Sequence, residues 1–196
     1  MHETDAIILN TRKSGEADEL INIYTKDFGK LLLKVRAAKK ITTKQGNFLH
    51  TPSIVRCGFV TTRGGYVLSG IKSVREYREI SGNIFALGFV ISFFRICDSI
   101  LRDGQRDEKL WNLLTRVLEE ASGAAKRRDP GKILWRMEKA WLLTLLAVMG
   151  LKPDKLKLNS ISSASRLDIY IKKMLQDKFE RPVNFFGLQR YPEYKK

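Results

Sequence analysis

Residues 53–77 read SIVRCGFVTTRGGYVLSGIKSVREY, and this stretch decides the fold class. Residues 53–62 and 66–77 are rich in β-branched and aromatic side chains, which predicts two strands. Between them, Arg63-Gly64-Gly65 has the composition of a tight turn. The stretch therefore predicts a β-hairpin.

Three further strand-like segments precede this hairpin. Residues 6–11 are a short apolar run, residues 19–25 (ELINIYT) alternate, and residues 30–37 (KLLLKVRA) follow a turn at Phe28-Gly29. Five strands within 80 residues suit a small barrel of the OB type, although an SH3-like barrel fits the sequence almost as well. We expect an OB-fold nucleic-acid-binding domain over residues 1–80.

Beyond residue 80 the apolar spacing becomes that of helices. It predicts a helix over residues 84–101 that is apolar on all sides and enclosed, and an amphipathic helix over residues 107–121 that ends at Gly123. Two more helices are expected, one from the Asp129-Pro130 cap to Gly150 and one over residues 165–179. The predicted fold class is α+β, a five-stranded barrel followed by an all-α domain over residues 81–196 with an irregular tail.

Composition narrows the functional class. The chain has 196 residues, a formal net charge of +15 and two cysteines, Cys57 and Cys97, without CxxC spacing. We expect reduced, buried thiols, no metal site and a cytoplasmic location. No apolar run approaches the roughly 20 residues of a membrane span. The positive charge favours a polyanionic partner, nucleic acid first.

The positive charge is concentrated in one part of the sequence. Between Phe28 and Arg75 there are ten basic residues and no acidic residue, which predicts a positive face that contacts phosphates. On the strand over residues 30–37 the basic side chains share a parity opposite to that of Leu31, Leu33 and Val35. The candidate DNA contacts are Lys30, Lys34, Arg36, Lys39, Lys40, Lys44, Arg63, Lys72 and Arg75.

Two smaller groups add to this prediction. Among the aromatic residues between these cations, Phe48 and Tyr66 are candidates for stacking on bases. A second basic group surrounds the start of the third helix, where an anionic peptide or a phosphate could bind. Its members are Arg127, Arg128, Lys132 and Arg136.

Catalysis finds little support in the sequence. There is no GxxxxGK[ST] loop for a nucleotide, and the two histidines, His2 and His50, belong to no motif for a base or nucleophile. We therefore expect no enzyme and no cofactor. An RNA-binding or ribosome-associated barrel without annealing activity remains the alternative to a DNA-binding protein.

Five motifs follow one another along the chain, over residues 3–9 (ETDAIIL), 15–18 (GEAD), 24–30 (YTKDFGK), 35–40 (VRAAKK) and 149–153 (MGLKP). Their order and spacing resemble the RecO family of bacterial recombination mediators, over about residues 3–153. Many RecO proteins carry a CxxC zinc element after the last of these motifs. This chain has none there, so no zinc is expected, and residues 154–196 match no part of the family that we can place.

The resemblance implies a function. A RecO protein binds single- and double-stranded DNA, anneals complementary strands, and works with RecR and the single-strand binding protein SSB to load RecA indirectly. It implies that the basic candidates above contact DNA in a cytoplasmic, nucleoid-associated protein. It also implies that the helical domain receives the acidic tail of SSB, with Arg127, Arg128, Lys132 and Arg136 as the candidates here.

Overall fold

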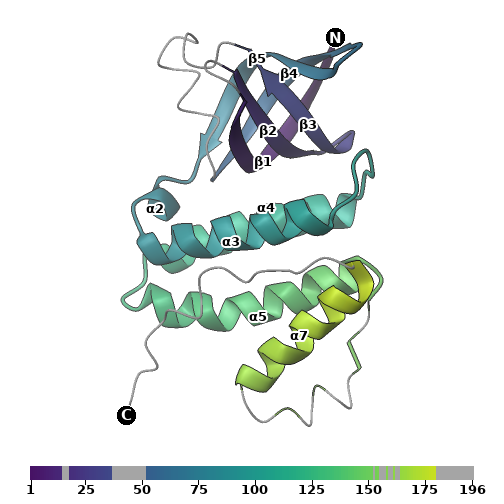
Figure 1. The fold of residues 1–196 in the computed structure, drawn as a ribbon. Helices are drawn as coiled ribbons and strands as arrows, with labels where there is room; N and C mark the ends of the chain where they lie inside the picture. Colours follow the sequence, from purple (N-terminus) through teal and green to yellow (C-terminus); the bar gives the residue numbers. More distant parts are fainter. Residues whose placement is uncertain are drawn as a thin grey trace.

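A computed structural model describes residues 1–14, 18–36, 52–151, 153–154, 158, 161 and 164–179. Five strands form a closed barrel at one end of the molecule, and the helices lie in layers beneath it (Figure 1). Among the helices in the described part, none combines the length and the apolar composition of a membrane span.

The barrel has the strand order of an OB-fold. Its strands are β1 (His2–Ser14), β2 (Asp18–Thr25), β3 (Gly29–Val35), β4 (Ser53–Thr62) and β5 (Gly65–Glu76). They pair in the order β1-β2-β3-β5-β4, and β4 returns to β1 to close the barrel. All neighbours are antiparallel except β3 and β5. This five-stranded closed arrangement confirms the OB-type barrel.

The alternation in the sequence sets the two faces of the strands. In β3, Leu31, Leu33 and Val35 are buried inside the barrel, while Lys30 and Lys34 lie on the outer face, as predicted. The predicted hairpin is also present. Thr62 pairs with Gly65, whose φ of 106° is readily adopted by glycine.

The helices are α2 (Arg78–Ser81), α3 (Ile84–Ile100), α4 (Glu108–Ala125), α5 (Pro130–Val148) and α7 (Ala164–Phe179). The prediction that Gly123 ends the second predicted helix is wrong, because α4 continues to Ala125. Burial of Ala124, which is 5% exposed, favours the extra turn over the helix cost of a glycine. The short α2 was not predicted.

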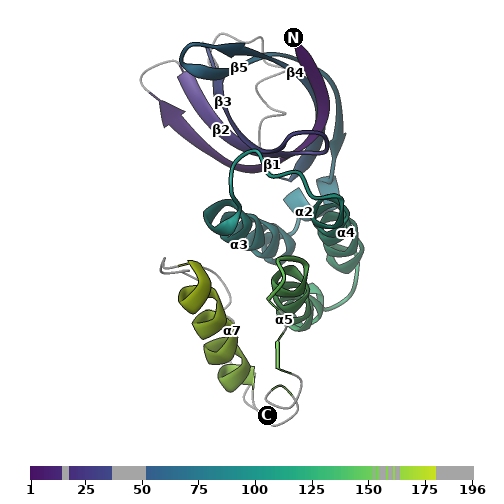
Figure 2. The same cartoon turned by 90° about the vertical axis from the view of Figure 1, so that its right-hand side faces the viewer.

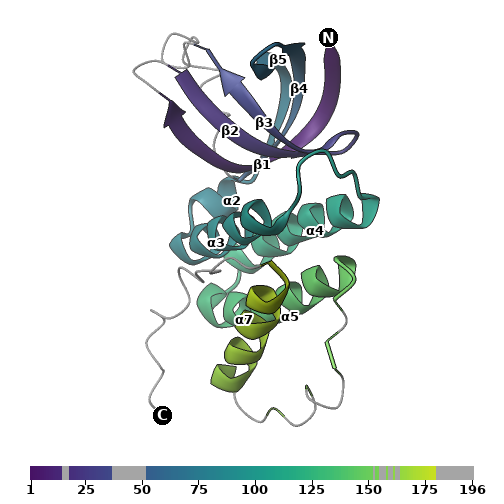
Figure 3. The ribbon, with the colours of Figure 1, turned by 45° about the vertical axis from the view of Figure 1, so that its right-hand side comes forward.

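α3 lies between the barrel and α5 (Figure 3), which explains its apolar composition. Phe89, Phe93 and Phe94 are buried, as the prediction of an enclosed helix requires. The first turn differs, because Ile84 is 80% exposed and Phe85 is 43% exposed.

One hydrophobic cluster joins the barrel to the helices. Ile7, Leu9 and Tyr24 lie on the outside of the barrel and pack in the same cluster as Phe89 and the other buried residues of α3. The boundary predicted at residue 80 falls within α2, where strands give way to helices. The hydrophobic cluster, however, crosses this boundary, so the barrel and the helices hold each other in place.

Candidate nucleic-acid interface

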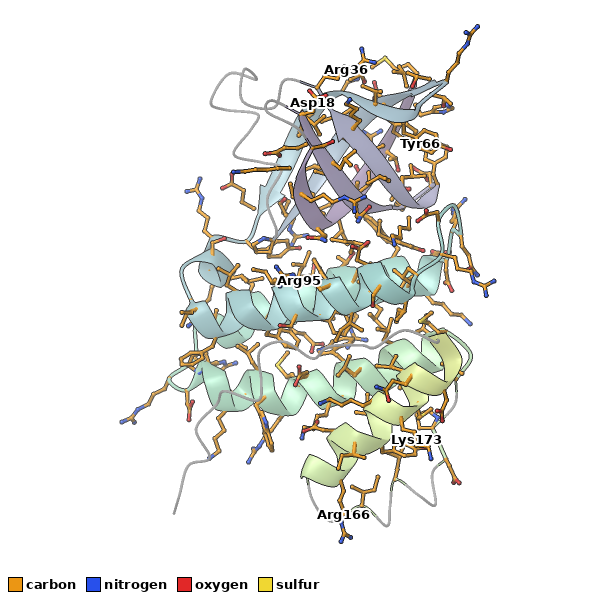
Figure 4. The ribbon with its side chains drawn as sticks, in the orientation of Figure 1. Asp18, Arg36, Tyr66, Arg95, Arg166 and Lys173 are labelled. Carbon is orange, nitrogen blue, oxygen red and sulfur yellow. The ribbon has the colours of Figure 1, made fainter. Side chains whose placement is uncertain are left out.

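The outer face of β1, β2 and β3 carries basic side chains at the end away from the helices. The register places Arg12 opposite Leu20 and Leu20 opposite Lys34, so these three side chains form a row across the strands. Arg36 is exposed directly after β3, and Figure 4 shows it with Asp18 at this end of the barrel. We call Arg12, Lys34 and Arg36 the basic strip.

The basic strip is accessible to a phosphate backbone. Lys34 Nζ lies 2.8 Å from Asp18 Oδ2, yet the Lys34 side chain is 44% exposed. Exposed ion pairs of this kind contribute little, so a phosphate can compete with the carboxylate. Arg12 was not predicted, because this residue precedes the acid-free stretch and the β1–β2 and β2–β3 registers place it in the same row as Lys34.

Lys30 does not belong to this surface, which corrects the prediction of a DNA contact there. Its side chain is only 12% exposed, and its Nζ lies 3.0 Å from Asp98 Oδ1 on α3. The ammonium also donates to the backbone carbonyl of Asp98. Lys30 shares the parity of Lys34, but its end of β3 lies over α3. Its charge is therefore used inside the molecule.

Asp98 gathers several polar groups beneath the barrel. Asn22 Nδ2 donates to Asp98 Oδ2 at 3.0 Å and Asn10 Nδ2 donates to the same oxygen at 3.4 Å. Together with Lys30 they form a polar cluster between β1, β2, β3 and α3. An aspartate within a mostly apolar helix was the signal in the sequence, since a buried carboxylate requires such partners.

Three more cations of the acid-free stretch pair with carboxylates from other segments. The pairs are Arg56–Asp5 at 3.2 Å, Arg75–Glu119 at 3.3 Å and Lys72–Glu3. The Lys72 ammonium lowers the pKa of the Glu3 carboxyl by hydrogen bonding to it. Of the described cations between residues 28 and 75, Arg36 and Arg63 have no carboxylate within 4 Å in the described part of the chain. The three exposed pairs are open to solvent as the Lys34–Asp18 pair is, but Arg56 lies on β4 and Lys72 and Arg75 lie on β5, outside the row across β1, β2 and β3.

The other predicted barrel contacts divide into two groups. Arg63 lies exposed in the β4–β5 turn, and Tyr66 follows on β5 with 37% of its surface exposed. Lys39, Lys40, Lys44 and Phe48 lie outside the residues that the structure describes.

The second basic group lies at the start of α5, in the helical layer farther from the barrel (Figure 1). Lys132 and Arg136 are exposed and one helical turn apart, and Arg127 and Arg128 are exposed just before the helix. The Asp129 side chain caps α5 by accepting from the Lys132 amide at 3.3 Å. The structure thus places these four predicted residues around one helix start.

The described residues offer little for metal or thiol chemistry. Among them, no three histidine, cysteine, aspartate or glutamate residues are grouped so that they could hold a metal ion. Cys57 and Cys97 are buried and not disulfide-bonded, as predicted. Burial raises the pKa of the Cys57 thiol to about 11. Neither thiol is therefore a reactive nucleophile.

Comparison with known proteins assigns the barrel. The family model described as "Recombination protein O N terminal" matches residues 1–77, which extend from the residue before β1 to the residue after β5. Residues 1–77 are therefore similar to the N-terminal domain of the RecO family. This confirms the resemblance read from the sequence motifs.

Relatives in the family extend the similarity into the helices. The "DNA repair protein RecO" of Symbiobacterium thermophilum is 24% identical over 79% of this chain and 58% of its own length. The proteins of the same name from Myxococcus xanthus and Enterococcus faecalis are 27% and 28% identical over 78% of this chain, and over 60% and 56% of their own lengths. The chain thus spans less than two thirds of these relatives.

Proposed function

We propose that this chain binds DNA through the basic strip of its barrel and acts in recombinational DNA repair. The observation that carries the proposal is the row formed by Arg12 and Lys34, with Arg36 beside it, on the outer face of a RecO-family OB-fold. OB-folds bind oligonucleotides on the face of their second and third strands. The names of the relatives, DNA repair proteins, support the same role.

The proposed mechanism is electrostatic. Cations on the strip displace counterions from two phosphate backbones and hold complementary strands close enough to pair. Arg63 and, shortly after Arg36 in the sequence, Lys39, Lys40 and Lys44 extend this set. Annealing of this kind requires neither a nucleotide nor a nucleophile. We therefore propose a binding protein rather than an enzyme, acting in the cytoplasm at the nucleoid.

The second basic group supports a proposal about partners. The acidic tail of SSB would bind around Arg127, Arg128, Lys132 and Arg136, where exposed cations meet the positive end of the α5 dipole. Together with RecR as a further partner, the chain would help to load RecA onto single strands that are coated with SSB, without binding RecA itself. DNA and the SSB tail then use different surfaces.

The test of DNA binding is a salt titration of strand binding, together with ATP-free annealing in EDTA. The triple variant Arg12→Gln, Lys34→Gln, Arg36→Gln should bind more weakly to every DNA sequence. Its slope of log K against log salt should fall by up to about 3, because each removed cation leaves one phosphate with its counterions in place.

The matched control changes charge without touching the strip. Arg56→Gln and Lys72→Gln remove exposed cations of β4 and β5, which lie outside the row across β1, β2 and β3, and they should leave the slope within about 0.5 of the parent value. An unchanged slope in the folded triple variant would exclude the strip. Binding that prefers structured RNA, with no annealing, would favour an RNA-binding barrel instead.

A further inference from the structure

A cleft opens in the barrel wall between β3 and the β4–β5 hairpin. β3 and β5 pair at Leu33–Tyr66 and Lys34–Val67, and β5 begins at Gly65, so the first residues of β3 have no partner on β5. At the start of β3, Lys30 instead forms an isolated β-bridge with Asp103. The Gly104 amide donates to the Lys30 carbonyl at 2.9 Å. The cleft between these two pairings has a volume of about 370 Å³.

Aromatic rings form much of the cleft wall. Phe59 is 1% exposed and lies at the centre of the group, with Phe28 and Tyr66 in T-shaped contact at centroid distances of 5.4 and 5.5 Å. The His2 ring stacks on Phe59 at 5.2 Å. Tyr66 is 37% exposed, and the ring contact that the structure gives it is the T-shaped one with Phe59. Its ring can therefore still stack against a ligand.

Polar and charged groups border the same rings. The Asp27 carboxylate, which accepts from Thr4 Oγ1 at 2.8 Å, and the exposed Arg106 both line the cleft. Arg63 is exposed in the turn three residues before Tyr66. The combination of aromatic walls, a hydrogen-bond acceptor and flanking guanidinium groups fits a planar heterocycle that carries phosphates.

Size and geometry restrict the ligand further. Pockets for small molecules range from about 300 to 1,000 Å³, so this cleft is at the small end and suits a single ring system. A base inside a duplex is stacked and paired on both sides and cannot enter a cleft in a barrel wall without leaving the helix. A base in a single strand has no such cost.

We propose that the cleft between β3 and the β4–β5 hairpin receives one unpaired nucleobase of a bound single strand. The base stacks on Tyr66, and Arg63 and Arg106 contact the adjoining phosphates. This inference rests on the proposed DNA binding and adds to it a means of distinguishing single strands from duplexes. The basic strip supplies sequence-independent affinity for both forms.

The experiment compares Tyr66→Leu with Tyr66→Phe on a thymine single strand and a duplex of equal length. Tyr66→Leu should bind the single strand about tenfold more weakly, because the stacking surface is removed, and the duplex with unchanged affinity. Tyr66→Phe keeps the ring and should retain the affinity of the parent. Phe85→Leu is the matched control, since it removes an exposed ring from α3.

A second measurement does not depend on the stability of any variant. A single strand containing 5-iodouracil should photo-crosslink to the unmodified protein at Tyr66 or Phe28. The assignment would be overturned if Tyr66→Leu lost the same affinity for the single strand and for the duplex. It would also be overturned if the crosslinks were confined to residues away from the cleft. Either result would leave the proposed DNA binding intact. If the parent protein bound neither substrate, the proposed function would fail first, and this inference with it.

Discussion

Gly29 lies where the β2–β3 turn meets the segment that follows α3. Its φ is 70°, and a Cβ at this position would collide with the backbone of Gln105 and Arg106. Gly29→Ala should therefore destabilise the fold by more than about 2 kcal/mol, from both backbone strain and the clash. Gly64→Ala, where a Cβ meets nothing within 4 Å, should change stability by less than about 0.5 kcal/mol in the same urea titration.

Glu138 is an ionisable residue that sequence reasoning overlooked. It is 8% exposed on α5, and burial raises its pKa to about 7, with a further contribution from the like charge of Asp168. Lys139, whose Nζ lies 3.2 Å from Asp168 Oδ1, partly opposes the shift. The native state therefore holds a proton on Glu138 over a pH range in which the unfolded chain has released it.

This raised pKa predicts a pH dependence of stability. Between the ordinary glutamate value of 4.5 and the native value of about 7, the native state binds more protons, so its stability falls as pH rises through 7. Glu138→Gln should abolish that fall, and its advantage over the parent should grow by up to about 3 kcal/mol from pH 5 to pH 8. The free energies of unfolding of both proteins are measured by urea titration at each pH. If they changed with pH in parallel, the buried position of Glu138 would be contradicted.

The contact between β3 and α3 depends on the Lys30–Asp98 pair. Both side chains are less than 15% exposed, at 12% and 14%. Lys30→Met should leave the Asp98 carboxylate without its cation and cost about 3 kcal/mol of unfolding free energy. Lys34→Met is the matched control on the same strand. Its pair with Asp18 is more exposed, so the destabilisation there should stay below about 1 kcal/mol.

The same two variants separate structural from binding roles. In the DNA salt titration, Lys34→Met should lower the slope of log K against log salt by about 1, whereas folded Lys30→Met should leave it unchanged. A lowered slope in Lys30→Met would return this lysine to the DNA surface. The expected contrast follows from the position of α3, which covers one end of β3 and leaves the other open.

The two basic surfaces lie in different layers of the molecule. Figure 2 shows the barrel at one end, α3 and α4 below it, and α5 and α7 beyond them. Arg128→Ser with Lys132→Ser should therefore weaken binding of an acidic SSB-tail peptide and leave DNA affinity within about twofold. Peptide titrations with and without saturating DNA provide the measurement. Equal weakening of peptide and DNA binding would indicate a single shared site.

Much of the fold could be predicted because its signals are local. The alternation in β3, the Gly-rich turn before Gly65 and the Asp129-Pro130 cap each act within a few residues, and the structure confirms them. Where neighbouring elements overrode a local signal, prediction failed, as at Gly123, where helix packing continues α4. Family motifs in the barrel were likewise readable from the chain alone.

The sequence by itself determined the strands, most of the helix starts and the excess of positive charge. Only the tertiary structure decided that the charge of Lys30 is used inside the molecule, since its partner Asp98 comes from α3, outside the acid-free stretch. Register alone placed Arg12 and Lys34 in one row, on either side of Leu20. Periodicity depends on neighbours along the chain, whereas an ion pair depends on distance in space, and folding sets that distance between residues far apart in sequence.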